Sequence, residues 1–181
     1  IGQRYEELFR CGINVVSCNG RAFAVPYSRY AAMKMAAHDN GVTLKYDTTV
    51  GAALPILETI ACSSYSSDKI TSIEAAISCT LNYIITGYDG SRSETFATLL
   101  RRAQREGLTE KDPRMDLGGQ DALRKLLIIA REAGVPLDEK DVTIEPYLGP
   151  EFFECSIDKF YELLDARESY FEAREDELDR L

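Results

Sequence analysis

The stretch INVVSCNGRAFAVPYSRYAAMKMAAHDNGVTLKYDTT, residues 13–49, decides the fold. Residues 13–17 and 42–49 at its two ends are rich in β-branched residues and predict two strands, of which the first is short and buried. Between them, residues 27–39 predict a helix that ends at Asn40-Gly41. A strand, a crossover helix and a second strand form the unit of a parallel sheet, so this stretch predicts a doubly wound α/β arrangement. The packed face of the helix is expected to carry Tyr27, Tyr30, Ala31 and Met35.

After residue 50 the sequence pattern changes, and the predicted structure becomes mainly helical. We therefore expect a fold between α/β and α+β, with one domain over residues 1–50 and a second, helix-rich domain with a mixed sheet over residues 51–181. The further expected helices cover residues 4–10, 55–63, 78–85, 91–107, 117–134 and 156–181, and the further expected strands cover residues 69–77 and 142–146.

Composition and charge exclude several classes of function. The 181 residues carry a net charge of −9, which argues against nucleic acid as a partner because the phosphate backbone requires a basic surface. No apolar run reaches the length of a membrane span and no signal peptide opens the sequence, so we expect no membrane contact. Five widely spaced cysteines without a C-x-x-C pair predict reduced thiols in a cytoplasmic protein. The single histidine, His38, is expected on the surface near a helix C-terminus and is not our candidate catalyst.

The charge-rich segment TEKDPRMDLGGQDALRK, residues 109–125, is the strongest candidate for a functional site. A helix is expected to begin just after Asp116, which would be its N-cap, and Asp121 and Lys125 would then share one helix face. Glu110 in the preceding loop could converge on the same place. The same pattern is typical of an acidic, solvated loop followed by an ordinary surface ion pair, and spacing alone favours that interpretation.

Three motifs, met in this order along the chain, resemble those of the homoserine dehydrogenase family. Residues 46–55, YDTTVGAALP, resemble the family's Y-E/D-T-x-V-G-A-G-L-P segment, and residues 77–84, ISCTLNYI, resemble its S-G-T-L-S-Y-I-F segment. Residues 109–132 resemble its acidic loop followed by R-K-L-L-I-L-A-R-E. Residues 141–146, DVTIEP, are similar to members that are fused to an aspartokinase. The resemblance covers nearly the whole chain.

The resemblance implies reversible, NAD(P)-dependent oxidation of homoserine to aspartate 4-semialdehyde, on the way to threonine and methionine. Glu110 and Asp121 would hold the substrate, whose ammonium group is a natural partner of carboxylates. Thr80 would line the pocket, Lys125 would pass the proton to and from the substrate oxygen, and Asp116 would orient Lys125.

By the same resemblance, residues 1–50 would be the C-terminal part of a Rossmann-like nucleotide-binding domain, and residues 51–181 would serve substrate binding, catalysis and dimerisation. NAD or NADP would bind the full-length protein, with Asn19 and Arg21 near the cofactor. No G-x-G-x-x-G occurs in the 181 residues, so the isolated chain is predicted to be inactive. A homodimer and a fusion to an aspartokinase are further implications.

A monovalent cation such as sodium is also implied, because oxygen ligands suit a hard ion. A structural turn without metal fits the same residues. The implied ligands are Asp47 and the backbone carbonyls of Val50, Ala52 and Leu54.

Several family residues are replaced, mostly on the cofactor side. Gly20 stands where the family has a lysine, and Cys79 stands where it has a glycine. Two alternatives therefore stay open: a non-catalytic assembly or regulatory domain descended from the family, and an acidic helical binding module. A structure in which Glu110, Asp121 and Lys125 point apart would favour the binding module. Further replacements are Ala53 for a glycine, Leu108 for a tyrosine, Lys111 for a proline and Met115 for an aspartate.

Overall fold

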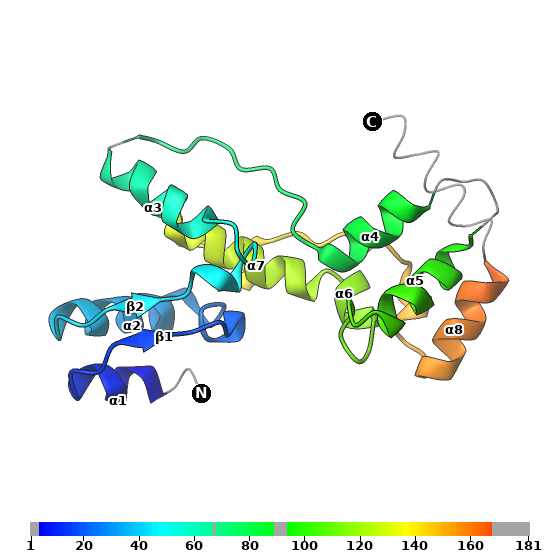
Figure 1. Cartoon of the computed structure of the whole chain (residues 1–181), viewed down its shortest axis with the longest axis horizontal. Helices are drawn as coiled ribbons and strands as arrows, with labels where there is room; N and C mark the ends of the chain where they lie inside the picture. The colour runs from blue at the N-terminus through cyan, green and yellow to red at the C-terminus, as the bar shows by residue number, and fades with distance from the viewer. Residues whose placement is uncertain (1–3, 67, 89–93, 168–181) are drawn as a thin grey trace. The chain divides into compact units, whose positions relative to one another are not determined.

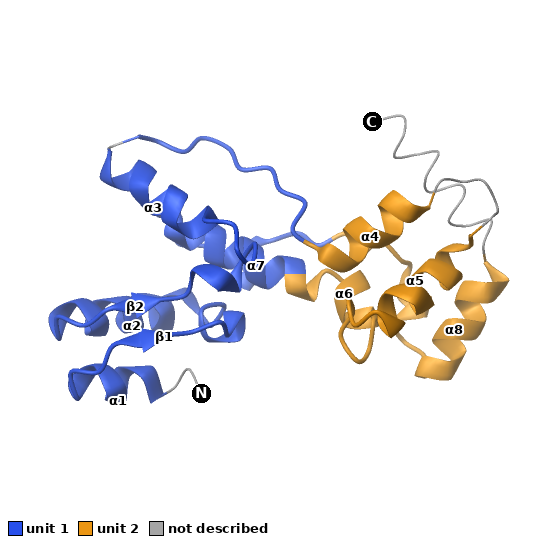
Figure 2. Cartoon of the chain, in the orientation of Figure 1, with its two compact units in different colours: residues 1–77, 122–144 blue, residues 78–121, 145–181 orange. Residues whose placement is uncertain are grey.

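The computed structural model describes residues 4–66, 68–88 and 94–167 (Figure 1). The chain forms two compact units, each described by itself below (Figure 2). Unit 1 consists of residues 1–77 and 122–144, and unit 2 of residues 78–121 and 145–181. The sequence-based boundary near residue 50 separates a nucleotide-binding part from a substrate-binding part. It stays a prediction, because compactness alone assigns no function to a segment.

Unit 1 contains the parallel strand–helix–strand arrangement that residues 13–49 predict. β1 (Val15–Val16) pairs in parallel with β2 (Leu44–Lys45), Val15 opposite Leu44 and Val16 opposite Lys45, and α2 (Tyr27–Asp39) connects the two strands. The predicted fold class, between α/β and α+β, is confirmed as a helical chain with a small parallel sheet. The unit also holds α1 (Tyr5–Arg10), α3 (Ile56–Tyr65), most of α7 (Gln120–Glu132) and short 3-10 helices at Gly20–Ala22, Asp47–Thr49 and Glu139–Asp141.

Both strands are shorter than predicted. Tyr46 leaves the extended conformation, with φ −152° and ψ 26°, and a 3-10 helix follows, so the second strand ends at Lys45. Val16 is 85% exposed, so only one of the two β1 residues is buried. The packed face of α2 is also rotated from the prediction, because Met35 is 63% exposed. The buried residues of α2 are Tyr30, Met33 and Ala37.

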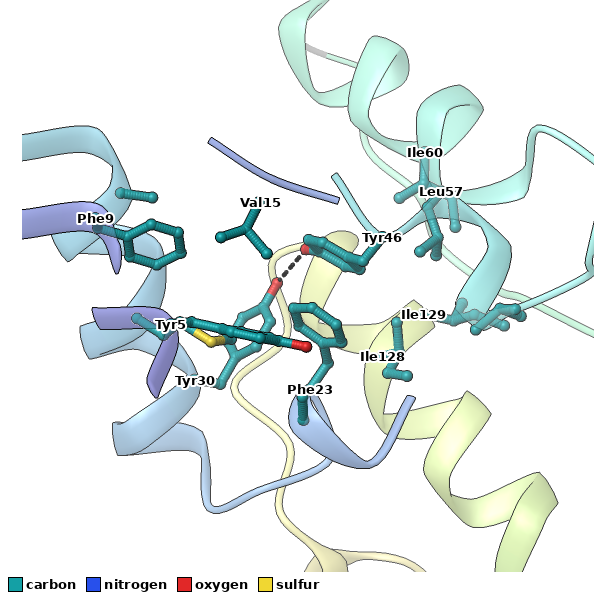
Figure 3. Packing of buried hydrophobic residues seen from close by; sticks show 14 residues of the cluster. Tyr5, Phe9, Val15, Phe23, Tyr30, Tyr46, Leu57, Ile60, Ile128 and Ile129 are labelled. Atoms are coloured by element: carbon teal, nitrogen blue, oxygen red, sulfur yellow. Dashed lines mark hydrogen bonds between the residues drawn. The ribbon is translucent and has the colours of Figure 1, made fainter. Parts of the chain in front are cut away.

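One cluster of aromatic and aliphatic side chains forms the core of unit 1 (Figure 3). Phe23 stacks on Tyr46 with ring centroids 4.1 Å apart, and the hydroxyl oxygens of Tyr30 and Tyr46 lie 3.0 Å apart in a buried hydrogen bond. The helix α7 adds Ile128 and Ile129 to this cluster. A segment some eighty residues later in the sequence therefore completes a core that the first sixty residues begin, and burial of this apolar surface is its main stabilising term.

The strand predicted for residues 69–77 is wrong. These residues are largely exposed and make no backbone–backbone hydrogen bond to any other described residue. A strand requires a neighbour for its N–H and C=O groups, and within the described part of unit 1 the only sheet is the parallel pair of β1 and β2. The predicted mixed sheet is therefore not formed by the described residues.

Unit 2 is helical and is organised around α5 (Phe96–Arg105). The helix predicted over residues 91–107 carries a buried apolar stripe at helical spacing, and Gly107 follows the helix with a φ of 74° and ends it. The stripe packs against α4 (Cys79–Gly87) and α8 (Ile157–Ala166) in the second core cluster. The fully buried stripe residues are Phe96, Leu99, Leu100 and Ala103.

Three helices of unit 2 begin at a hydroxyl side chain that caps them. Ser78, Thr95 and Ser156 each accept a hydrogen bond from the backbone N–H three residues later, so they begin α4, α5 and α8. The helix predicted from residue 91 begins at Phe96 after the Thr95 cap, and residues 91–93 lie outside the described residues. The long helix predicted from residue 156 is seen as far as Ala166, and its remainder, from residue 168, also lies outside them.

The charge-rich segment 109–125 forms two helices where one was predicted. α6 (Arg114–Leu117) ends before a glycine pair, and α7 begins at Gln120. Gly119 has a φ of 78°, a conformation that glycine adopts without steric cost and that breaks the helix. Asp116 therefore lies inside α6, and its predicted role as the N-cap of the long helix is wrong.

Candidate functional site

Acidic residues of unit 2 gather around the hydroxyl of Thr80. Thr80 lies on α4 and is only 2% exposed, and its Oγ1 lies 2.7 Å from the carbonyl oxygen of Leu108 and 3.2 Å from Oδ1 of Asp116. The other carboxylate oxygen of Asp116 accepts the backbone N–H of Glu110 at 2.9 Å. The side chain of Asp116, on α6, thus connects to α4 through Thr80 and to the loop through the backbone of Glu110. The loop therefore has a defined conformation.

The environment of Asp116 disfavours its negative charge. Burial raises the pKa of Asp116, and the charges of Glu110 and Asp121 raise it further, against the lowering effect of its two hydrogen bonds. The hydroxyl of Thr80 carries one proton, and its shorter contact is to the carbonyl of Leu108. The contact of Thr80 with Asp116 lowers the pKa of that carboxyl group, so it opposes the effect of burial and of the neighbouring charges. A cation bound near Glu110 and Asp121 would also favour the ionised form of Asp116.

Lys125 lies one turn after Asp121 on α7, in the part of that helix that belongs to unit 1. It is half-buried, and its Nζ donates a hydrogen bond of 2.6 Å to the carbonyl oxygen of Ile77. In unit 2, Asp116 contacts Thr80 and the backbone of Glu110, and the charges of Glu110 and Asp121 act on it. The role of Lys125, like those of the four residues in unit 2, stays a prediction.

The residues predicted on the cofactor side lie at the 3-10 turn after β1. Asn19 precedes the turn, and its N–H donates to Oγ of Ser17 at 3.1 Å. Arg21 is exposed. A Cβ atom at Gly20 would lie 3.6 Å from Cδ1 of Ile128 and 3.8 Å from the carbonyl oxygen of Thr49, which are ordinary contact distances. The space around the turn would therefore accept a Cβ atom at Gly20.

Two charged residues at the end of α7 have substantial interactions that the sequence interpretation did not foresee. Arg131 is buried and donates to the carbonyl oxygens of Phe23 (2.7 Å) and Leu137 (3.0 and 2.9 Å) and to Oδ1 of Asp138 (3.1 Å). Burial lowers the pKa of Arg131. The signal was available, because Leu123, Leu127 and Arg131 recur every fourth residue and place a charge on the apolar stripe.

The neighbouring Glu132 binds a different set of partners in unit 1. Its carboxylate accepts hydrogen bonds from Tyr30 (3.2 Å), from Lys34 (3.4 Å) and from the hydroxyl of Tyr46. Burial raises the pKa of both tyrosines, so they donate as neutral hydroxyls. The hydrogen-bond partners of Arg131 and Glu132 thus differ, although both side chains lie at Tyr30.

The predicted cation ligands lie on the loop between β2 and α3. Gly51 and Ala52 both have positive φ, 75° and 51°, whereas Ala53, which replaces a family glycine, does not, so that replacement costs no backbone strain. Asp47 is partly buried, and no hydrogen bond or ion pair joins its carboxylate to the part of the chain that the structure describes. The donor set of one carboxylate and carbonyl oxygens fits a hard monovalent ion. The described residues contain no metal-binding group of three or more His, Cys, Asp or Glu side chains.

The remaining sequence expectations concern groups outside these sites. The side chain of His38 is 90% exposed in the last turn of α2, as predicted, and all five cysteines are free. Within residues 4–66, 68–88 and 94–167, no helix has the length and apolar character that crossing a bilayer requires.

Comparison with known proteins identifies relatives across this chain. The family model described as homoserine dehydrogenase matches residues 55–172. A bifunctional aspartokinase/homoserine dehydrogenase 2 of Arabidopsis thaliana, chloroplastic, is 36% identical over 165 residues, which are 91% of this chain and 18% of that protein. The chain spans about a fifth of the length of such bifunctional relatives.

Solved structures agree with this match. A Candida auris protein of unknown function has a TM-score of 0.88 at 25% identity, over 97% of this chain and 51% of that one. A hyperthermophilic archaeal homoserine dehydrogenase in complex with NADPH has a TM-score of 0.63 at 25% identity, over 73% of this chain and 40% of that one.

Proposed function

The chain belongs to the homoserine dehydrogenase family, and from that premise we propose that the full-length protein oxidises homoserine to aspartate 4-semialdehyde with NAD or NADP. Because the chain spans about a fifth of its bifunctional relatives, activity, substrate and partners are proposed for the full-length protein. The observation that carries the proposal is the cluster of Glu110, Asp116 and Asp121 at the buried Thr80.

The cluster favours a substrate that carries an ammonium group. Glu110 and Asp121 both act electrostatically on Asp116, and their negative charges disfavour its ionised form. The ammonium group of homoserine would relieve this repulsion by donating charge-assisted hydrogen bonds to the carboxylates. Glu110 and Asp121 are therefore the proposed substrate-binding residues, and Thr80 lines the same pocket.

The chemical step breaks the C4–H bond and the O–H bond of the substrate alcohol and forms a carbonyl group. The nicotinamide, when bound, supplies the acceptor for the hydride that leaves C4. Lys125 is proposed to take the hydroxyl proton through Nζ, and to return it in the reverse direction. Asp116, by its position in the family, is proposed to orient Lys125.

Two residues of the turn after β1, Asn19 and Arg21, are suited to contact part of a nicotinamide cofactor. Arg21 is an exposed guanidinium on a turn at the carboxyl end of a parallel strand, where α/β folds bind nucleotides, and it suits their phosphate groups. Asn19 lies beside it. The G-x-G-x-x-G turn that seats a pyrophosphate does not occur in the 181 residues, so Asn19 and Arg21 are proposed as secondary contacts.

Further properties are proposed from the family and from named relatives. A monovalent cation such as sodium is proposed at Asp47 and the carbonyls of Val50, Ala52 and Leu54. The bifunctional relatives support a fusion to an aspartokinase. The exposed segment 69–77, which makes no backbone–backbone hydrogen bond to the described residues, supports a homodimer in which the segment gains a strand partner. The five free cysteines support a reducing compartment, which we propose to be the cytoplasm.

Homoserine-dependent reduction of NAD or NADP by the full-length protein tests the proposal, with aspartate 4-semialdehyde identified as the product. Absence of turnover would favour the non-catalytic alternative, which Gly20 and Cys79 support. A double variant separates the two outcomes. Gly20→Lys with Cys79→Gly restores the family residues, and in an active enzyme it should lower KM for the nucleotide. If both proteins fold and neither turns over homoserine, the proposed activity is wrong.

A further inference from the structure

We propose that Arg131 is a positioning residue for the cofactor-side turn, residues 19–23. It fixes the turn at two points, which are the last residue of the turn and the first residue of the following helix. The inference rests on the proposed function, because it assigns that turn to the nicotinamide cofactor. Sequence similarity placed Arg131 in a motif without giving it a role.

The first anchor is the end of the turn itself. Nη1 of Arg131 donates a buried hydrogen bond of 2.7 Å to the carbonyl oxygen of Phe23. Phe23 is the C-cap of the 3-10 helix, and its own N–H donates to the carbonyl oxygen of Gly20 at 3.0 Å. The guanidinium thus fixes the residue that closes the turn carrying Asn19 and Arg21.

The second anchor is the first residue of α2. Oδ1 of Asp138 accepts one bond from Nη2 of Arg131 at 3.1 Å and one from the backbone N–H of Tyr27 at 2.7 Å. Nε and Nη2 of Arg131 also donate to the carbonyl oxygen of Leu137. The same guanidinium therefore holds both ends of the short connection from the turn to α2.

The geometry suits arginine and no smaller cation. The side chain of Arg131 is 0% exposed, and its guanidinium lies 5.9 Å and 5.4 Å from the ring centroids of Tyr27 and Tyr30. A planar fork with five donors reaches carbonyls on opposite sides at once, whereas a lysine ammonium is a point donor. A buried charge of this kind is weak evidence for stability alone, since an apolar residue fills such a site as well. The hydrogen bonds of the arginine additionally fix the orientation of the turn.

Glu132 provides a matched control one residue away. It ends the same helix and is also largely buried, with a side chain 15% exposed, but its carboxylate binds Tyr30, Tyr46 and Lys34 and no residue of the turn. Glu132→Gln therefore perturbs the helix end while the hydrogen bonds of Arg131 to Phe23 and Asp138 stay in place.

The first experiment measures steady-state kinetics of the full-length protein. We expect Arg131→Lys to raise KM for the nicotinamide nucleotide by about 5-fold or more and to leave KM for homoserine within about 2-fold, since only the cofactor side moves. Glu132→Gln should leave both KM values within about 2-fold. An equal rise in both KM values for Arg131→Lys, or the same nucleotide effect in Glu132→Gln, would overturn the inference.

The second experiment needs no activity and so separates the inference from the proposed function. Trypsin cleaves after Arg21 in the turn and after Arg10 at the end of α1, both of them exposed. Release of the turn should speed cleavage after Arg21 by about 5-fold relative to cleavage after Arg10, as followed by mass spectrometry. Where Arg131→Lys does not fold, Asp138→Asn is the milder variant, because Asp138 is 35% exposed, and a smaller rise in the same ratio is expected. If the ratio of cleavage after Arg21 to cleavage after Arg10 is unchanged in the folded variants, the positioning role is contradicted. If the ratio rises in the variants but the wild type has no activity, only the proposed enzymatic function is contradicted.

Discussion

Substitutions at two glycines of unit 1 should change stability in opposite directions, for reasons that the local geometry gives. At Gly20 an added Cβ meets only ordinary contacts, the nearest at 3.6 Å, and the backbone lies outside the left-handed region. Gly20→Ala therefore reduces the entropy of the unfolded chain without straining the folded one, which is worth about 0.4–1 kcal/mol. For a chain of this size such a gain raises Tm by about 1–4 °C.

The matched control is Gly51→Ala. A Cβ there would lie 2.3 Å from Cδ1 of Ile56, at a φ of 75° that side chains rarely adopt. The variant should lose about 1 kcal/mol or more, from strain in the left-handed region and displacement of the isoleucine. Urea unfolding of the three proteins, followed by circular dichroism, gives the differences directly. If Gly20→Ala is destabilised as much as Gly51→Ala, the turn is packed more tightly than the structure shows, and the room for a side chain at Gly20 does not exist.

Two more variants test the electrostatics and the packing of unit 2. Because the pKa of Asp116 is raised from its ordinary value of 3.8, the native state binds its proton more tightly than the unfolded state, and stability is lost as pH rises above about 4. Asp116→Asn should lack this loss, so its stability relative to the wild type should rise between acid and neutral pH, and it should lose activity. A wild type that gains stability relative to Asp116→Asn over that range would contradict the sign. Phe160→Ala, at a fully buried position of α8, should cost about 3–5 kcal/mol in urea unfolding, against about 1 kcal/mol for Ile157→Ala on the same helix, which is 36% exposed. Equal costs would place Phe160 outside the core.

Local patterns predicted much of the fold correctly. The parallel pairing of β1 with β2 followed from two β-branched segments around a helix, and the α5 stripe followed from helical periodicity. The failures have a common physical cause, since each depended on distant partners. Residues 69–77 carry a strand pattern but have no strand beside them in the described chain, and Met35 faces solvent because unit 1 packs against a neighbouring face of α2.

The candidate site was predicted in part, and for a different reason. Periodicity left residues 109–125 as either a loop or a site, and only the resemblance to a family singled out Glu110, Asp116 and Asp121. The structure adds what sequence could not contain, which is the burial of Thr80 and the bond between Asp116 and the Glu110 backbone. Arg131 was missed because a charge near a helix end is usually on the surface, and its partners at Phe23 and Asp138 lie on separate segments.

The turnover number of a Lys125→Met variant of the full-length protein tests the central claim most directly. Loss of a group that transfers the substrate proton is expected to lower kcat for homoserine oxidation by about 10²–10⁴-fold. Lys111→Met, an exposed lysine in the same charge-rich segment, should retain kcat within about 2-fold. If the folded Lys125→Met protein turns over homoserine at the wild-type rate, the proton passes through another group and the account of this site is wrong.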